Sequence, residues 1–368
     1  MKRLTAIGLA SLAAYGILLV AKWDGSGAST EGKPGESAVV ATGNLAVGSG
    51  LPASGDGLVQ AMPVRQLSTM RMPVSRSTAP GAHSSTVAAE FRSSRDLKAF
   101  ADALAARKGQ LTADERFHLA KALESCLFAN SINEDLASYS AKQRRQFLAS
   151  LPAGDPNAAL RVAAFDSVDD TARCLRFRGT KIALRDIDDL YLAAAQQGDA
   201  RAQAKLLVNE IQRTNQANPR DDAGNPSRIA PEDLARIVAI LETGDPEALM
   251  TVGSLLAQSP IKEQLRIGPN EEMPEPTAFI GAWNLVACDL GLECGSQHRD
   301  LQQACAFAAY CGAGHFEEHY QTFVASPFVY QQAQRYRALI HSALATRNWA
   351  QLGLTQKLTS VAAAKPSK

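Results

Sequence analysis

The residues of this sequence best suited to chemistry are six cysteines, at positions 126, 174, 288, 294, 305 and 311. Thiolates can bind zinc, exchange disulfides or form structural cross-links, and their spacing helps to distinguish these uses. Zinc sites favour cysteines two to four residues apart, and redox-active dithiols favour two intervening residues. The last four cysteines are instead separated by five, ten and five residues. An even number at such spacings predicts structural disulfides in an oxidising compartment.

The pairing of these cysteines follows from a duplicated pattern. Cys294 and Cys311 each precede a glycine, and each follows another cysteine by six positions near the end of a predicted helix. Residues six apart in a continuous helix lie about 9 Å apart along the axis, too far for a disulfide, so the glycine must reverse the chain. We favour the local pairs Cys288–Cys294 and Cys305–Cys311; the alternative is Cys288–Cys305 with Cys294–Cys311. Either set leaves the pair Cys126–Cys174.

A second candidate is the segment His315-Phe316-Glu317-Glu318-His319. It resembles the inverted motif of zinc peptidases, which implies His315 and His319 as ligands and Glu318 as the base. That family also requires an acidic ligand downstream, and no Asp or Glu occurs from residue 320 to residue 368. We therefore expect a polar helix face with no catalytic residue, cofactor or metal; the alternative is metal binding by His315 and His319 alone.

Two carboxylate clusters have residue types that could bind a cation or act in acid–base catalysis. Asp221 and Asp222 precede Asn225, but they lack the alternating ligands and the closing glutamate of a calcium loop. Glu271, Glu272 and Glu275 lie among prolines, where adjacent carboxylates are usually solvated. Both clusters are predicted to be surface loops.

The N-terminus predicts a membrane anchor over residues 1–23. An uncharged run from residue 4 to residue 21 follows Lys2 and Arg3, and as a helix it would rise about 27 Å, close to the hydrocarbon thickness of a bilayer. The basic residues before the run favour a cytoplasmic N-terminus, which places the rest in the periplasm of a bacterium. The alternative is a cleaved signal peptide and a periplasmic or secreted protein.

The composition divides the remainder of the chain. Residues 24–90 hold 10 Gly, 10 Ser and 5 Pro in 67 positions, which predicts a flexible linker. Residues 91–360 are rich in alanine and leucine at helical spacing, and residues 361–368 are predicted to be a disordered tail. Helix starts are indicated by Thr112 with Glu115, by Ser131 with Glu134, and by Ser326 before Pro327.

A weak repeat runs through the predicted helical region. The five-residue segments 154–158, 198–202 and 244–248 each begin with Gly-Asp and end with Ala, 44 and 46 residues apart. Glycine can end one helix in a left-handed conformation and aspartate can cap the next. We expect an all-α fold, either an irregular α-solenoid-like repeat or a multi-helix domain, cross-linked by disulfides.

Two resemblances accompany this pattern. Residues 193–199 with Ala202, and residues 240–245 with Ala248, resemble tetratricopeptide-related helical repeats. The segment from residue 283 to residue 312 is similar to part of uncharacterised envelope proteins of proteobacteria. The first resemblance implies helix pairs that stack on their neighbours; the second implies no activity.

The charge excludes one class of function and leaves two hypotheses. The chain has 38 basic and 37 acidic residues, so no basic face for nucleic acid is expected. We predict a membrane-tethered periplasmic scaffold that binds protein partners and has no catalytic site. The alternative is an envelope hydrolase, namely a zinc-dependent peptidase using His315, Glu318 and His319.

Overall fold

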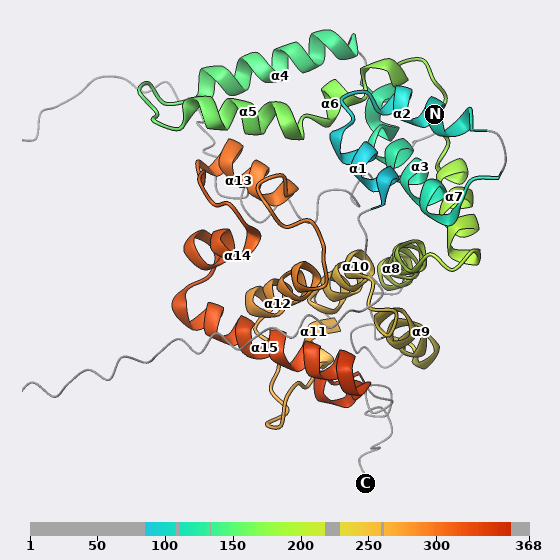
Figure 1. Ribbon diagram of the computed structural model, residues 1–368, viewed down its shortest axis with the longest axis vertical. Helices are drawn as coiled ribbons and strands as arrows, with labels where there is room; N and C mark the ends of the chain where they lie inside the picture. The colour runs from blue at the N-terminus through green and yellow to red at the C-terminus, as the bar shows by residue number, and fades with distance from the viewer. Residues whose placement is uncertain (1–84, 108–109, 133, 218–228, 259–260, 355–368) are drawn as a thin grey trace, which may run out of the picture. The chain divides into compact units, whose positions relative to one another are not determined.

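The computed structural model describes residues 85–107, 110–132, 134–217, 229–258 and 261–354. Within these ranges every regular element is helical, and the only β-type pairing is two isolated bridges. The prediction of an all-α fold is confirmed for this part of the chain (Figure 1). No helix in these ranges is long and apolar enough to cross a membrane; the predicted anchor, most of the linker and the tail lie outside them.

Fifteen α-helices occur in the described ranges, and three of them (α6, α11 and α14) are single turns. In chain order they are α1 (Thr86–Ser93), α2 (Leu97–Ala105), α3 (Ala113–Ser125), α4 (Leu136–Ser150), α5 (Ala158–Val168), α6 (Asp170–Arg173), α7 (Leu184–Gln196), α8 (Ala200–Ala217), α9 (Pro231–Leu241), α10 (Pro246–Leu256), α11 (Ile261–Gln264), α12 (Pro276–Asp289), α13 (Arg299–Ala308), α14 (Phe316–His319) and α15 (Pro327–Thr346).

Helix α1 corrects the predicted end of the linker. It begins at Thr86, so the linker prediction is wrong for residues 86–90. The Ser85 hydroxyl accepts the Ala88 N–H at 3.0 Å and caps the helix. Val87 and Phe91 are buried in a core shared with α2 and α3. A two-turn helix contains too few apolar residues to stand out from a Gly/Ser-rich segment.

Two of the three predicted helix starts are confirmed. Thr112 and Glu115 form a capping box, and the Ser326 hydroxyl caps α15. The start predicted at Ser131 is wrong, because α4 begins five residues later. There the Asp135 carboxylate accepts the Ser138 N–H at 2.8 Å, and Ser131 ends a short 3₁₀ turn instead.

The Gly-Asp corners are built as predicted at the last two copies. Gly198 and Gly244 have φ of 90° and 69°, the left-handed region that glycine adopts readily. Asp199 accepts the backbone N–H three residues on at 3.0 Å, and Asp245 does the same at 2.8 Å. In the first copy the helix begins only at Ala158, after Asn157, which makes no capping hydrogen bond.

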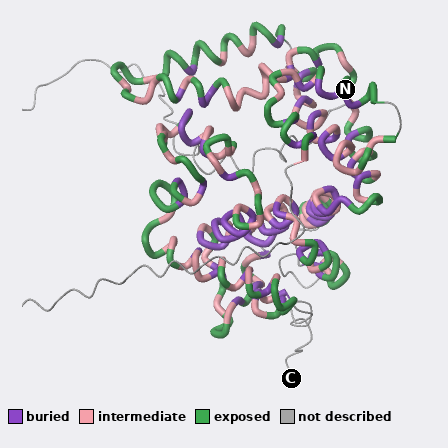
Figure 2. The backbone as a smooth tube through the Cα atoms, viewed as in Figure 1, coloured by how far each residue is buried: buried purple, intermediate pink, exposed green. Residues whose placement is uncertain are grey.

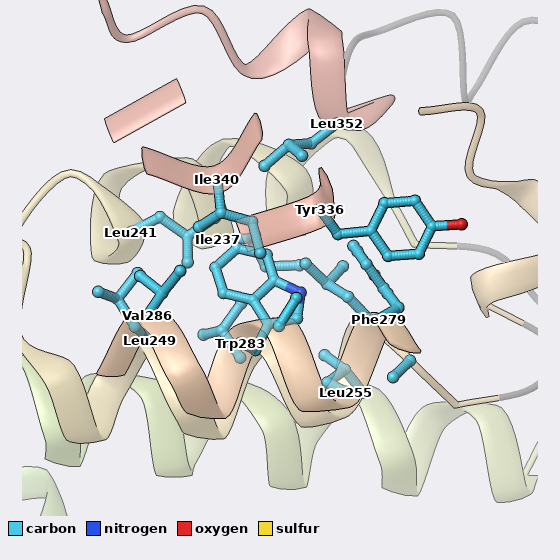
Figure 3. Packing of buried hydrophobic residues seen from close by; sticks show 14 of the residues in the cluster. Ile237, Leu241, Leu249, Leu255, Phe279, Trp283, Val286, Tyr336, Ile340 and Leu352 are labelled. Atoms are coloured by element: carbon cyan, nitrogen blue, oxygen red, sulfur yellow. The ribbon is translucent and has the colours of Figure 1, made fainter. Parts of the chain in front are cut away.

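The largest core lies among α8, α9, α10, α12 and α15, and Trp283 of α12 is near its centre (Figure 3). Buried residues are concentrated on α10 and α12, whereas α4 is mostly exposed (Figure 2). Gly253 allows α10 to approach α12 closely. A Cβ atom at Gly253 would lie 2.6 Å from Cβ and Cδ2 of Trp283, and nearer still to Cγ.

A buried polar cluster joins the N-terminal helices to the repeat corners. The Arg201 guanidinium donates to Asp199 at 2.5 Å and to Asp114 of α3 at 2.8 Å, and it lies 4.4 Å from the centre of the Phe117 ring. Burial alone would raise the pKa of Asp114, but hydrogen bonds with His118 and Arg201 outweigh burial and lower it well below its usual value.

The disulfide Cys126–Cys174 links the ends of α3 and α6 across 48 residues, and both cysteines are fully buried. In the chain-entropy model, a cross-link closing a loop of this length stabilises the fold by about 4 kcal/mol, against about 2 kcal/mol for a six-residue loop. The double variant Cys126→Ala/Cys174→Ala should therefore unfold at lower denaturant concentration than Cys305→Ala/Cys311→Ala. Urea unfolding followed by fluorescence measures both, and an equal loss would contradict the loop-length argument.

Candidate functional site

The candidate site is a cleft between α5 and α13. These helices are far apart in sequence but lie side by side and antiparallel. The Ser167 hydroxyl donates to Gln302 at 3.0 Å, and the Arg161 guanidinium donates to the Ala306 carbonyl at 3.0 Å. The rings of Phe147 on α4 and Phe165 on α5 stack with their centres 4.3 Å apart. The ribbons of α4, α5 and α13 are neighbours (Figure 1).

Arg161 fixes one wall of the cleft. It is a buried cation on α5, and its charge is balanced by Asp155 at 2.7 Å. This ion pair, more than any other contact, lowers the pKa of Asp155. The carbonyl that Arg161 also binds belongs to the last turn of α13, where the helix dipole favours a positive charge. The first Gly-Asp corner thus holds the C-terminal end of α13 in place.

The second wall is a loop closed by a disulfide. Ala309 ends α13 in a left-handed conformation, with φ of 61°, and the Tyr310 N–H donates to the Ala304 carbonyl at 3.1 Å. Cys311 then returns to bond with Cys305. After the chain reversal, residues 310–314 line the cleft together with residues of α13.

The cleft has a volume of about 470 Å³ and two chemically different ends. The apolar end is formed by Leu160 and Tyr310 with the Cys305–Cys311 disulfide. The polar end contains the Ser167 hydroxyl, the Gln302 amide and the exposed guanidinium of Arg95; the remaining lining residues are Ala163, Ala164, Ser296, Gln297, Leu301, Gly312, Ala313 and Gly314. A pocket with an apolar wall and a few polar groups is typical of a ligand site.

Exposed apolar side chains are concentrated on α4, on α5 and on the segment that begins with α13, and two of them, Leu160 and Tyr310, line the cleft. Ten large hydrophobic residues are exposed in the described ranges, and seven are on α4, α5 or the segment from α13 to the start of α15: Leu148, Leu160, Phe307, Tyr310, Phe323, Val324 and Phe328. Phe307 is 60% exposed although it contacts both Phe147 and Phe165. The Phe323 ring stacks on Tyr310 at 4.7 Å. Gathered apolar exposure of this kind marks interaction surfaces.

The structure contains three disulfides, Cys126–Cys174, Cys288–Cys294 and Cys305–Cys311. The two local pairs favoured from the sequence are therefore the ones formed. All six cysteines are bonded. Cys294 is buried in the large core, whereas Cys311 lines the cleft and is partly exposed.

The residues of the segment 315–319 make local hydrogen bonds or are buried. His315 precedes α14, and its Nδ1 accepts the Glu317 N–H at 3.2 Å. Glu318 accepts the Gly314 N–H at 2.8 Å. His319 is buried among aromatic rings, its Nδ1 has no hydrogen-bond partner, and burial lowers its pKa. His298 caps α13 nearby. Within the described ranges no three His, Cys, Asp or Glu side chains are grouped to hold a metal ion.

The other carboxylates that the sequence suggested are also structural or lie outside the described residues. Glu272 pairs with Arg335 at 2.8 Å, and Glu275 caps α12 by accepting the Ala278 N–H at 2.5 Å. The segment from Asp221 to Asn225 lies outside the described ranges. Neither Glu272 nor Glu275 lines the cleft between α5 and α13.

Sequence reasoning did not find the cleft itself. Its apolar end depends on residues that look ordinary in sequence, such as Leu160 of α5 and Tyr310 after α13. One available signal was the pair of cysteines flanking Tyr310, since a disulfide loop often holds a side chain in an exposed position.

Comparison with known proteins gives no matching family model, no matching curated protein and no matching solved structure. The resemblances to tetratricopeptide-related repeats and to envelope proteins therefore stay predictions.

Proposed function

We propose that this chain is a membrane-tethered, non-catalytic interaction protein whose helical domain lies in the periplasm and binds protein partners at the cleft between α5 and α13. The single observation that carries the proposal is the exposed apolar surface at that cleft, formed by Leu160 and Tyr310 with Phe323 stacked on Tyr310. The tether is the predicted span at residues 4–21 with the linker that follows. Disulfide bonding of every cysteine agrees with an oxidising compartment.

The construction of the cleft suits docking. The Cys305–Cys311 disulfide and the Arg161–Asp155 ion pair hold its two walls without a ligand. A surface already ordered before binding loses less conformational entropy on association. Tyr310 also presents an apolar ring and a hydroxyl together, a combination enriched where proteins meet.

The hydrolase alternative requires His315 and Glu318 to change their hydrogen bonds. His315 and Glu318 would have to give up their backbone hydrogen bonds to act as ligand and base. The acidic third ligand that the peptidase motif requires is missing downstream. Stoichiometric zinc in the purified full chain, lost on His319→Ala, would favour this alternative over the scaffold.

Photo-crosslinking tests the docking function. The full chain is expressed in its native envelope with benzoylphenylalanine at position 310, and in a parallel strain at position 184. Leu184 is the matched control, since it is an exposed apolar residue on α7. We expect one protein, identified by mass spectrometry, to crosslink from position 310 at least ten times more strongly than from position 184.

A second variant controls for crosslinker placement. Leu160→Glu puts a charge into the apolar end of the cleft and should remove the crosslink from position 310 while leaving the protein folded. Equal crosslinking from positions 310 and 184, or a crosslink that survives Leu160→Glu, would contradict docking at the cleft.

A further inference from the structure

We propose that the cleft binds an extended peptide segment of a partner protein, in which a carboxylate pairs with Arg95 and an apolar side chain about three residues away packs against Leu160 and Tyr310. This inference rests on the proposed docking function and specifies the chemistry of the partner. It follows from the charge, the length and the backbone of the cleft.

Arg95 is bound to a backbone carbonyl rather than to a carboxylate among the described residues. Its Nη1 donates to the backbone carbonyl of Asp166 at 3.0 Å. The Asp166 carboxylate is bound by Arg144 instead, at 2.8 and 3.0 Å. No carboxylate in the described ranges forms an ion pair with Arg95, which is exposed at the polar end of the cleft. A guanidinium held in this way offers its remaining donors to a carboxylate.

Positive charge is in excess beside Arg95. Arg173 and Arg299 share a single carboxylate, that of Asp170, at 3.4 and 2.6 Å. The pKa of Arg173 is lowered by burial and further by the neighbouring Arg299 and Arg95, although Asp170 opposes this. A carboxylate from a partner would relieve repulsion among these three arginines.

The distance between the apolar and polar ends of the cleft fits a short extended peptide. On α5 the cleft runs from Leu160 to Ser167, seven residues along one face, which corresponds to about 10 Å of helix. An extended peptide rises about 3.3 Å per residue. A carboxylate at the Ser167 end therefore places an apolar side chain about three residues away against Leu160.

The unpaired backbone donors at the cleft favour a peptide over a small amphiphile. Gly312 and Ala313 line the cleft, and their backbone N–H groups have no hydrogen-bond acceptor among the described residues. Exposed backbone donors beside a groove can pair with an extended chain, as in strand addition. A fatty acid would satisfy Arg95 and Leu160 but would leave these donors unpaired.

Peptide selection tests the inference. The full chain in lipid nanodiscs is presented with three pools of random biotinylated heptapeptides. The first has a free C-terminus and no Asp or Glu, the second is amidated and contains Asp and Glu, and the third is amidated without them. We expect enrichment from the first or second pool at least tenfold above the third, with Leu, Ile, Val or Phe two to four residues from the carboxylate.

Enriched peptides are then measured against matched variants. Arg95→Gln should weaken their binding at least tenfold, and Arg95→Lys should weaken it less. Arg213→Gln is the control, because Arg213 is an exposed arginine on α8 whose one hydrogen bond to a described residue is likewise to a backbone carbonyl, that of Asn209, at 3.2 Å. This variant should bind as the unmodified chain does.

The outcomes separate this inference from the docking function. Equal enrichment from the third pool, no enrichment from any pool, or full binding by Arg95→Gln overturns the carboxylate inference. If the crosslink from position 310 is nevertheless obtained, the docking function stands without it. If peptides are selected as expected but no partner crosslinks in the envelope, the cleft is a peptide site and the docking function falls.

Discussion

Replacing Gly253 by alanine is expected to lower the free energy of unfolding by about 3 kcal/mol, the upper range for overpacked cores. The added methyl group would lie 2.6 Å from Cβ and Cδ2 of Trp283, much closer than carbon atoms can approach. The contact is between two helices rather than with the end of a flexible side chain. Relief therefore requires α10 and α12 to move apart, which loosens the core shown in Figure 3. Urea unfolding followed by tryptophan fluorescence measures the loss.

Gly154→Ala is the control for this variant. Gly154 has φ of 77°, so alanine there is strained, but its methyl group would meet no atom within 4 Å. We expect a loss of about 1–2 kcal/mol from the left-handed conformation alone. The double variant Gly253→Ala/Trp283→Ala should lose less than the sum of the single variants, since removing the indole removes most of the clash. Equal losses at positions 253 and 154 would show that close approach of the helices is not what requires glycine.

Replacing Arg201 by leucine is expected to cost about 3–5 kcal/mol, the range for leaving a buried charge without its partner. Arg201 pairs with Asp199 and Asp114, and the side chain of Asp199 is only 4% exposed. Without the guanidinium, two carboxylates would lie close together in a half-buried site. Leucine retains apolar contact with Phe117, so the loss measured by urea unfolding reports mainly on the charge.

Arg236→Leu is the matched control for this variant. Arg236 also bonds two carboxylates, at 2.9 and 3.0 Å, but its side chain is 47% exposed, and exposed ion pairs contribute at most about 1 kcal/mol. Asp199→Asn should recover part of the loss in the Arg201 variant, because asparagine caps the helix without a charge. A loss at position 201 no larger than that at position 236 would contradict the assignment of a buried cluster.

The same cluster gives stability a pH dependence of known sign. The pKa of Asp114 is lower in the folded protein than in the unfolded chain, so the folded state binds the proton less tightly. The stabilisation is complete above about pH 5 and is lost progressively as the pH falls below that value. Since Arg201 provides part of the shift, the Arg201→Leu variant should lose less stability than the unmodified chain between pH 5 and pH 3.

Helix ends were predictable where they depend on a glycine in the left-handed conformation or on a side chain that caps a backbone N–H a few residues away. Gly198 with Asp199 and Gly244 with Asp245 end one helix and cap the next without help from distant residues. The prediction failed at Ser131, where a better cap, Asp135, lies four residues on. Serine and aspartate compete for such positions, and sequence spacing alone does not show which one the chain uses.

The cleft could not be predicted, because its walls meet through tertiary packing. The Arg161 contact with Ala306 joins residues 145 positions apart, and an arginine on a helix would be expected from its sequence to face solvent. The buried cluster left one overlooked signal. Arg201 and Glu247 occupy the same place in two copies of the Gly-Asp corner with opposite charge, a pattern that favours contact between the corners.

The disulfides pair each cysteine with the next one along the chain: the first with the second, the third with the fourth, and the fifth with the sixth. Six cysteines allow fifteen pairings, and this is the one reached when thiols are oxidised in the order in which they leave a translocation channel. When the second, fourth or sixth cysteine of the chain emerges, one free thiol has already emerged, and that thiol belongs to its native partner. A domain that crosses the membrane in sequence order behind the proposed anchor would thus complete its covalent structure with an oxidant alone, without an isomerase to correct mismatched bonds.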